Sequence, residues 1–192
     1  VSFEGDLACY YRLHLRSRLA FRVLREIASF ECRGPEDLYW NVREAIDWER
    51  WLDPSNSFRV DVTGTSPGLT HSHFTALQVK NALVDRQKEI WGQRSSVNIK
   101  QPDFCLHLHL YQGNGFLSLD GSGVSLHRRG YRAAMGLAPL KENFAAGLLQ
   151  ASSWNSSYPL VDPLCGSGTF LIEAASLAYN LAPGIGRSFL FE

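Results

Sequence analysis

The sequence predicts a mixed α and β chain whose last third begins a doubly wound α/β sheet. In the first two thirds, segments that alternate apolar and polar residues lie between segments of helical periodicity. Near the end, a short apolar run, a glycine-rich turn and a helical segment follow one another in LVDPLCGSGTFLIEAA, residues 160–175. Strand, glycine turn and helix in this order form the ligand-binding corner of doubly wound sheets.

The composition permits a buried core and gives no overall attraction to nucleic acid. Hydrophobic residues make up 45% of the 192 residues, and 19 Lys and Arg balance 19 Asp and Glu. Contact with nucleic acid would therefore depend on a local basic cluster. No apolar run approaches the ~18 residues of a membrane span, and no secretory signal opens the chain.

The cysteines and the two ends of the chain indicate the redox state of the thiols and the extent of the protein. Cys9, Cys32, Cys105 and Cys165 form no C-x-x-C pair, which argues against a zinc knuckle or a redox pair. We expect reduced thiols and a cytoplasmic location. The chain begins at Val1 and ends in RSFLFE without a helix cap, so we expect a piece of a longer protein.

The first block, residues 1–54, contains two predicted helices around an ambiguous segment. Asp6 is placed to cap a helix through residues 7–17. Residues 21–30 suit either period, and their β-branched content slightly favours a strand. Residues 34–48 predict a helix with Pro35 near its start and an apolar stripe of Leu38, Val42 and Ile46. We expect Trp40, Trp48 and Trp51 to pack in a core or a domain interface.

The second block, residues 55–123, predicts strands around a long helix. SFRVDVTG, residues 57–64, alternates as a half-buried strand does. A helix follows, with Ser72 as N-cap and an apolar stripe of Ala76, Val79, Leu83 and Ile90. Residues 103–111 predict a strand with Phe104, Leu106, Leu108 and Leu110 on one face. Gly113-Asn114-Gly115 indicates a hairpin that returns through residues 116–120.

His107 and His109 lie on the opposite face of that strand, beside Cys105 and Tyr111. Two histidines on one side can bind a metal. No third ligand stands at a suitable spacing, so a solvated or RNA-facing surface is the favoured interpretation and no metal is expected.

The third block opens with the densest basic cluster of the chain, which comprises His127, Arg128, Arg129 and Arg132 around Tyr131. Pro139 then predicts the start of a helix whose buried face is Leu140, Phe144 and Leu148. After the glycine turn, the last helix is expected to pack Leu171, Ala174, Ala175 and Ala178 inward.

The glycine turn argues against two common ligand classes. It has no lysine of a Walker loop, and Leu171 stands where a dinucleotide fingerprint has its third glycine. Asp162, directly before the turn, would repel a phosphate but suits a cationic amino group, such as the methionine end of S-adenosylmethionine. Gly166 and Gly168 would let the backbone approach that ligand.

DPLCGSGTFLIEAA resembles motif I of class I methyltransferases that act on nucleic-acid amino groups. Together with SLHRRGYRAAMGLAPLKENFAAGLL, it resembles the bacterial ribosomal RNA guanine-N2 methyltransferases of the large subunit that carry a THUMP domain. Upstream, VSFEGD, SRLAFRVL, DLYWNVREAIDW and QVKNALVD stand in the order of that family.

The resemblance implies an α+β THUMP region followed by the start of an α/β Rossmann-like class I methyltransferase domain. Residues 1–54 would be the remainder of a ferredoxin-like α+β domain, residues 55–125 the THUMP RNA-binding core, and residues 126–192 the beginning of the methyltransferase domain. It also implies S-adenosylmethionine as cofactor and methylation of guanine N2 in 23S ribosomal RNA, free or in a precursor particle. A transfer RNA substrate, or an RNA-binding module without activity, are the alternatives.

The expected site residues fall in two groups. The cofactor would be lined by Asp162, Gly166, Ser167, Gly168 and Thr169, with Pro163 and Cys165 shaping the turn. RNA phosphates would meet Lys80, Arg86 and Lys88 on the long helix and Arg128, Arg129 and Arg132.

Other residues keep open roles. Glu173 either supports the turn or is a plain helical charge, and residues 139–142 either flank the cofactor or merely start a helix. The family's catalytic motif, Asn-Pro-Pro-Tyr, is not found, so no catalytic residue is assigned. Glu192 is the sole acid near the distance expected for a ribose ligand.

Overall fold

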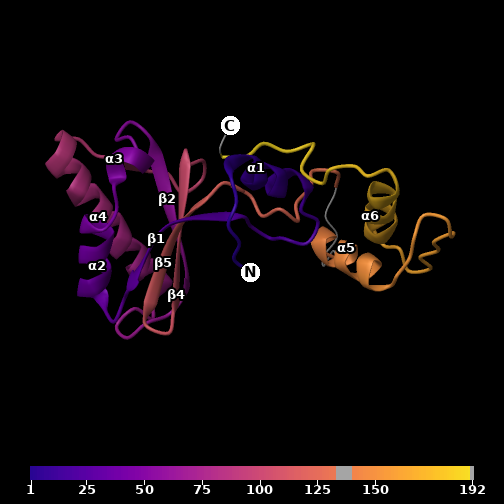
Figure 1. The fold of residues 1–192 in the computed structure, drawn as a ribbon, viewed down its shortest axis with the longest axis horizontal. Helices are drawn as coiled ribbons and strands as arrows, with labels where there is room; N and C mark the ends of the chain where they lie inside the picture. Colours follow the sequence, from indigo (N-terminus) through magenta and orange to yellow (C-terminus); the bar gives the residue numbers. More distant parts are fainter. Residues whose placement is uncertain (133–139, 191–192) are drawn as a thin grey trace. The chain divides into compact units, whose positions relative to one another are not determined.

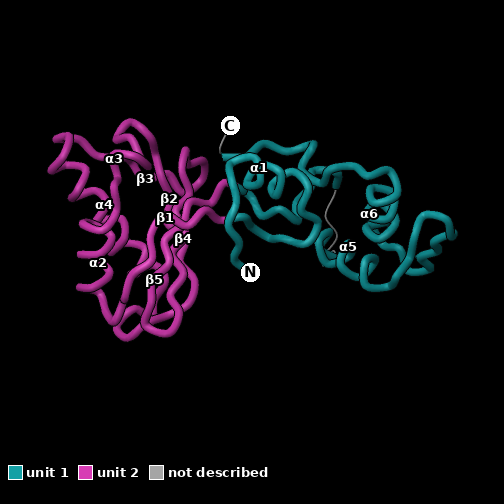
Figure 2. The backbone as a smooth tube through the Cα atoms, in the orientation of Figure 1, with its two compact units in different colours: residues 1–23, 122–190, 192 teal, residues 24–121, 191 magenta. Residues whose placement is uncertain are grey.

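The structure is a computed structural model that describes residues 1–132 and 140–190. The described chain forms two compact units, coloured separately in Figure 2. Unit 1 comprises residues 1–23 and 122–190, and unit 2 comprises residues 24–121. Residue 54, the first predicted boundary, lies inside unit 2. No helix of the described residues has the length and apolar character to cross a bilayer.

Unit 2 is built on a five-stranded mixed sheet of order β1-β5-β4-β2-β3. The strands are β1 (Leu24–Glu31), β2 (Ser57–Gly64), β3 (Ser96–Val97), β4 (Phe104–Tyr111) and β5 (Asn114–Asp120). β5 pairs antiparallel with β1 and β4, whereas β2 pairs parallel with β4 and β3. The ambiguous segment 21–30 is therefore mainly strand, because β1 finds a partner in β5.

Two helices of unit 2, α2 (Pro35–Glu44) and α4 (Ser72–Trp91), lie side by side against one face of this sheet (Figure 1). The predicted stripe of Leu38, Val42 and Ile46 is buried, as are Val79 and Leu83 of α4. They pack on Phe58, Leu106, Leu108, Leu110 and Leu117 of the sheet. Tyr39 of α2 also donates a hydrogen bond of 2.9 Å to Asp85 of α4.

The burial of the tryptophans and the N-cap of α4 differ in part from the sequence predictions. Trp48 begins the short helix α3 (Trp48–Trp51) and is buried, with its Nε1 donating to the Val42 carbonyl at 2.8 Å. Trp51 is half-buried, but Trp40 is exposed, so the packing expectation is wrong for Trp40. The N-cap of α4 is His71 rather than Ser72, and its side chain makes no capping bond.

The predicted hairpin connects β4 and β5 through Gln112 and Gly113. Both residues have positive φ, 49° and 77°, as a two-residue type I′ turn requires. Tyr111 pairs with Asn114, so Asn114 and Gly115 already belong to β5. The turn is therefore one step earlier than the expected Gly113-Asn114-Gly115.

Unit 1 contains three helices, α1 (Leu7–Arg16), α5 (Glu142–Ala151) and α6 (Thr169–Ala178), in its described residues. Asp6 caps α1 as predicted, accepting from the Cys9 amide at 2.7 Å. Distant segments meet through hydrogen bonds: the Gly184 amide donates to the Leu15 carbonyl, and the Leu126 amide to that of Phe21. Residues 1–23 are thereby connected to the later part of unit 1, residues 122–190.

Residues 159–161 do not form the predicted strand. A strand is defined by pairing with a neighbouring backbone, and all the named strands of the described chain lie in unit 2. The sequence therefore predicts where a strand could precede the glycine turn. Such a strand also needs a neighbouring backbone to pair with, and the described residues of unit 1 do not supply one.

The buried faces of α5 and α6 differ from prediction. On α5, Phe144 is 57% and Leu148 42% exposed, and Leu140 precedes the helix. The buried stripe is instead Glu142, Ala145, Ala146 and Leu149. On α6, Ala174 is buried as predicted, but Leu171, Ala175 and Ala178 are exposed, while Thr169 and Glu173 are buried. Both helices turn an acidic side chain inward, and Pro139 lies outside the described residues.

Gly64, at the end of β2, offers a test of the sheet geometry. Its φ is 77°, and a Cβ there would lie 1.9 Å from the Leu110 carbonyl oxygen of β4. Gly92, the C-cap of α4, has a φ of 66° but open space around it. Gly92→Ala should lower the free energy of unfolding by about 1 kcal/mol for the positive φ. Gly64→Ala should cost about 2 kcal/mol more, because the backbone of β4 must move. Urea unfolding measures both, and equal losses would contradict this close approach.

Candidate cofactor-binding turn and RNA-facing residues

The glycine turn between residues 162 and 169 is closed by a backbone hydrogen bond and by two glycines. The Gly168 amide donates to the Cys165 carbonyl at 2.7 Å. Gly166 and Gly168 have φ values of 52° and 74°, a region that side chains with a Cβ seldom adopt. The two glycines therefore permit this turn directly before α6.

The space beside the turn is open. A Cβ built on Gly166 would meet nothing within 4 Å, and one on Gly168 would reach only Ile172 Cδ1 at 4.0 Å. Pro163, Cys165 and Ser167 are exposed. The turn is thus not filled by packed side chains, and its backbone is accessible to a ligand.

Asp162 stands at the entry of the turn with one carboxylate oxygen engaged locally. Its Oδ1 accepts from the Leu164 amide at 3.2 Å, an Asx turn. The side chain is half-buried, and no Lys, Arg or His of the described residues forms an ion pair with it. The carboxylate is therefore available to a cationic ligand group.

Helix α6 begins at Thr169 with Gly168 as its N-cap, and no side chain accepts from its first amides. Such amides, with the positive end of the helix dipole, favour a negatively charged or accepting ligand group. The turn therefore offers an acid on one side and donors on the other, a combination that fits the amino-acid end of S-adenosylmethionine.

Arg132 links this turn to helix α5. Its Nη2 donates to Thr169 Oγ1 at 3.0 Å and also to the Leu140 carbonyl oxygen. Its Nε lies 2.9 Å from Glu142 Oε1, with side chains 12% and 6% exposed. Thr169 Oγ1 is in turn 3.2 Å from Ser167 Oγ. A buried ion pair therefore leads by hydrogen bonds into the candidate cofactor turn.

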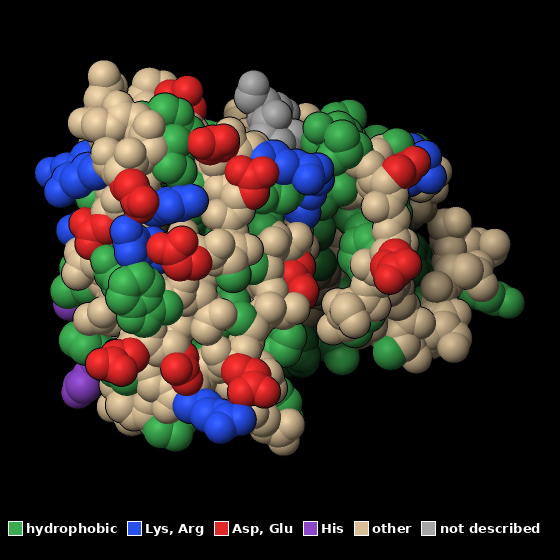
Figure 3. Space-filling view, turned by 60° about the vertical axis from the view of Figure 1, so that its left-hand side comes forward, with side chains coloured by type: hydrophobic (Ala, Val, Ile, Leu, Met, Phe, Trp, Pro, Cys, Tyr) green, Lys and Arg blue, Asp and Glu red, His purple; other side chains and the backbone are tan. Residues whose placement is uncertain are grey.

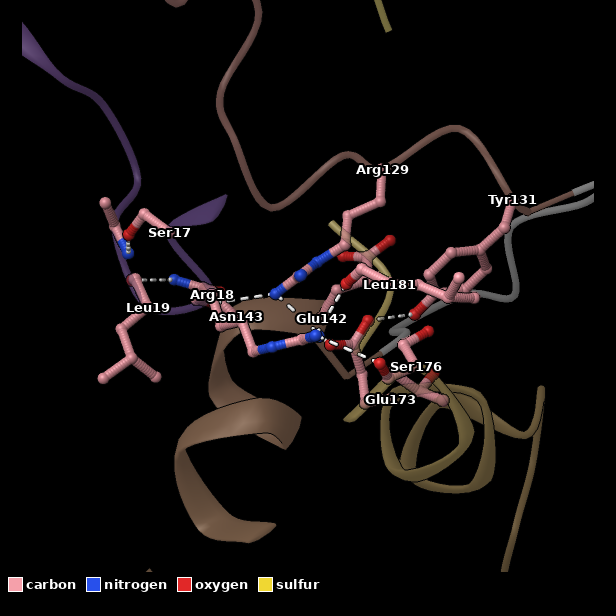
Figure 4. Close-up of polar contacts among 12 residues, drawn as sticks. Ser17, Arg18, Leu19, Arg129, Tyr131, Glu142, Asn143, Glu173, Ser176 and Leu181 are labelled. Atoms are coloured by element: carbon pink, nitrogen blue, oxygen red, sulfur yellow. Dashed lines mark hydrogen bonds and ion pairs between the residues drawn. The ribbon is translucent and has the colours of Figure 1, made fainter. Parts of the chain in front are cut away.

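A second buried cluster holds the body of α6 (Figure 4). Arg129 Nη2 lies 3.3 Å from Glu173 Oε2, with side chains 4% and 0% exposed, and it donates to the Arg18 carbonyl at 2.7 Å. Tyr131 donates to Glu173 Oε1 at 3.0 Å. Arg18 donates to the carbonyls of Ser176 and Leu181 near the end of α6. Glu173 is therefore an internal anchor rather than a solvated helical charge.

Burial governs the ionisation of this cluster. Loss of solvent raises the pKa of Glu173, although the nearby Arg129 and the Tyr131 hydroxyl oppose that rise. Burial and the Glu173 carboxylate raise the pKa of Tyr131, so its hydroxyl keeps the proton that it donates. Burial lowers the pKa of Arg18, with Arg129 contributing in the same direction.

The predicted basic cluster of the third block is therefore divided. Arg129 and Arg132 point inward to carboxylates, which corrects the expectation that they face RNA phosphates; only Arg128 of the three arginines is exposed. His127 is half-buried against Phe21, and burial lowers its pKa. The sequence held one indication of these pairs, a lone acid in the apolar run FLIEAASLA.

The three expected cations of α4 differ in their surroundings. Lys88 is exposed, Lys80 donates to Asn81 at 3.0 Å, and Arg86 lies 3.2 Å from Glu89. Lys80 also borders a hollow of about 320 Å³ between α4 and β2, shared with Arg59 and His73. Acidic and basic side chains are interspersed on the face shown in Figure 3, without a broad basic patch.

The histidine face of β4 and the four thiols complete the candidate groups. Thr63 Oγ1 lies 3.2 Å from His107 Nε2 and 3.0 Å from His109 Nδ1. His107 is buried rather than solvated, and the described residues contain no cluster suited to a metal. Cys165 is exposed, Cys9 half-buried, and Cys32 and Cys105 buried. Burial raises the pKa of Cys32 to about 11, so it remains a thiol at neutral pH.

Comparisons with known proteins place these two units in known domains. The THUMP domain model matches residues 33–120, and the RMKL-like methyltransferase domain model matches residues 129–192. The chain therefore contains a THUMP domain and a segment of an RMKL-like methyltransferase domain, which confirms the resemblance and the predicted fold class.

Relatives from several bacteria carry methyltransferase names. A Synechocystis protein named as an RNA methyltransferase is 50% identical over 96% of the chain, which spans 48% of that protein. A Cellvibrio japonicus protein named ribosomal RNA large subunit methyltransferase K/L is 47% identical over the whole chain, which spans 26% of it. The chain thus spans half or less of the length of these relatives.

Two solved structures share the fold at 34% identity. A Listeria monocytogenes protein described as an N6-adenine-specific DNA methylase has a TM-score of 0.85 over 97% of the chain, which covers 49% of that protein. A protein described as a methyltransferase complexed with SAH has a TM-score of 0.84 over 98% of the chain, which covers 50% of it.

The ion pair of Arg129 and Glu173 should dominate the stability of unit 1. Glu173→Ala leaves a guanidinium buried without its carboxylate and should lower the free energy of unfolding by about 3–5 kcal/mol. The control is Glu31→Ala, which breaks the exposed pair of Glu31 and Arg33 and should cost less than about 1 kcal/mol. Denaturant unfolding measures both variants, and similar small losses would show that the buried pair does not anchor α6.

Proposed function

We propose that the protein containing this chain transfers a methyl group from S-adenosylmethionine to N2 of a guanine in 23S ribosomal RNA. The observation that carries the proposal is the open glycine turn, with an acid at its entry and free helix amides beyond it. It lies within the segment matched by the methyltransferase domain model. The similar structure described as complexed with SAH supports the same cofactor class.

The residues of this chain would bind and orient the cofactor, which supplies the methyl group. Asp162 would accept from the ammonium group of its methionine end, and Gly166 and Gly168 would allow close backbone contact. Ser167 would contribute its hydroxyl group, and the buried Thr169 would support Ser167 from the start of α6, with Pro163 and Cys165 shaping the turn. Holding the cofactor in one orientation beside an unpaired base supplies rate by proximity alone.

The THUMP region would dock the RNA. We propose that Lys80, Arg86 and Lys88 of α4, with Arg128, neutralise phosphates without reading sequence. Lys80 is the best placed, because the hollow beside it is lined by Arg59 and His73 and by no acidic side chain among its described lining residues. The ribosomal RNA names of relatives support the RNA class. A cytoplasmic location belongs to the same proposal.

The domain boundaries are part of the proposal. The methyltransferase domain would begin near residue 126, the THUMP core would end near residue 125, and residues 1–54 would contain what remains of a ferredoxin-like domain. Glu192, the acid near the distance expected for a ribose ligand, lies outside the described residues.

The cofactor proposal predicts a specific loss on removing the Asp162 carboxylate. In the full-length protein, Asp162→Ala should weaken S-adenosylmethionine binding tenfold or more, because a charge-assisted hydrogen bond is worth about 1.5–3 kcal/mol. Calorimetric titration measures this. Asp53→Ala is the matched control, since Asp53 forms the same kind of Asx turn with Ser55 in unit 2.

Alkylation of Cys165 gives an independent readout of the same site. Cys165 is exposed in the turn, so bound cofactor should slow its reaction with iodoacetamide while leaving that of Cys9 unchanged. If the calorimetric titration shows no binding heat and the cofactor does not slow alkylation of Cys165, the chain is better described as an RNA-binding module without cofactor.

The RNA proposal predicts that Lys80→Gln and Lys88→Gln each weaken RNA binding and lower the salt slope of log K by about 1. Arg86→Gln should weaken RNA binding less, because Glu89 already neutralises the charge of Arg86. Arg33→Gln, at another exposed cation of unit 2, is the control and should not change affinity.

The substrate is tested by methylation of 23S ribosomal RNA, transfer RNA and duplex DNA with labelled S-adenosylmethionine and full-length protein. Label at guanine N2 of 23S RNA supports the proposal. Label on transfer RNA or on DNA adenine would replace it.

A further inference from the structure

Four side chains connect the interior of unit 1 to the exposed surface of the glycine turn. Glu142 of α5 pairs with Arg132 Nε at 2.9 Å, and Arg132 Nη2 donates to Thr169 Oγ1 at 3.0 Å. Thr169 Oγ1 lies 3.2 Å from Ser167 Oγ. Glu142 and Thr169 are buried, whereas Ser167 is exposed. The chain of contacts therefore runs from a buried carboxylate to a solvent-facing hydroxyl.

The chemistry of these groups limits the possible directions of the hydrogen bonds. A guanidinium has donors only, so Thr169 Oγ1 must accept from Arg132. The single hydroxyl proton of Thr169 is then available to donate to Ser167 Oγ. With its oxygen accepting there, Ser167 directs its own proton away from Thr169. In that arrangement, the exposed end of this series of contacts is a hydrogen-bond donor.

We propose that Arg132 is a positioning residue for the amino-acid end of the cofactor, acting through Thr169 on Ser167. The Ser167 hydroxyl, oriented as a donor, would receive the carboxylate of that end, while Asp162 receives the ammonium group. This inference rests on the proposed function, since it names how the same turn distinguishes the two charged groups of an α-amino acid.

The contacts of Arg132 with Glu142 and Thr169 explain why an arginine suits position 132. Its guanidinium forms an ion pair with the Glu142 carboxylate, 2.9 Å from Nε, and still directs Nη2 to two acceptors, Thr169 and the Leu140 carbonyl oxygen. A lysine has a single nitrogen and no fixed fork. The start of α5 and the start of α6 are thereby held by one side chain.

The test compares two ligands on the full-length protein, S-adenosylhomocysteine and 5′-methylthioadenosine, which lacks the amino-acid end. Thr169→Val keeps the shape of the side chain but removes the hydroxyl. It should weaken S-adenosylhomocysteine about tenfold, and methylthioadenosine less than twofold. Arg132→Gln should change the ratio of the two affinities in the same direction, and Thr169→Ser, which restores a hydroxyl, should return it near the wild-type value.

Arg129→Gln is the matched control, because Arg129 lies in the same segment and a similar buried ion pair but contacts Glu173, away from the turn. It should leave the ratio unchanged even where it lowers the melting temperature. Equal losses for both ligands in Thr169→Val, or an unchanged ratio, would overturn the proposal and leave Arg132 a structural residue.

Amide hydrogen exchange without ligand separates this inference from the proposed function. Arg132→Gln should speed exchange at the amides of residues 166–168 at least tenfold relative to wild type and to Arg129→Gln. If wild-type protein binds neither ligand, the proposed cofactor fails. Faster exchange would then still show that Arg132 fixes the turn, whereas unchanged exchange would remove that role too.

Discussion

Two carboxylates buried in unit 1 constrain the arrangement of everything around them. Glu173 and Glu142 face inward from α6 and α5, where an unpaired charge would cost several kcal/mol. Each finds one guanidinium in the short segment that contains Arg129 and Arg132. That segment is therefore held against both helices at once, which fixes their inward faces and the start of α6.

The candidate cofactor turn depends on this anchoring. The turn itself is exposed, carries two glycines with positive φ, and has little packing of its own. Exposed loops of this kind are ordinarily the least stable parts of a fold. Here Thr169, the first residue of α6, is held by Arg132, so the donors of the turn are set by buried charges. An accessible ligand site is thus carried on a rigid base.

Unit 2 is stabilised by different means. Its core lies between the sheet and the helices α2 and α4. Apart from the buried Asp120, charged side chains of unit 2 form mixed-sign groups near the surface, such as Arg43, Arg86, Glu44 and Glu89. Exposed pairs of this kind contribute little to stability. They also reduce the net positive charge on α4, so docking of RNA there would rely on individually placed cations such as Lys80 and Lys88 rather than on a broad field.

The sequence alone determined the features that depend on neighbours along the chain. Asp6 as the cap of α1, the buried stripe of α2, β2 and β4 as strands, and the glycine turn all follow from local periodicity and backbone preference. Tertiary structure decided what depends on distant partners. The pairing of β1 with β5 made 24–31 a strand, and the lack of a partner left 159–161 unpaired. The arginines of 129–132 were ambiguous for the same reason: a cation is attractive to a phosphate and to a buried carboxylate alike, and only the fold showed that Glu173 and Glu142 lie within reach.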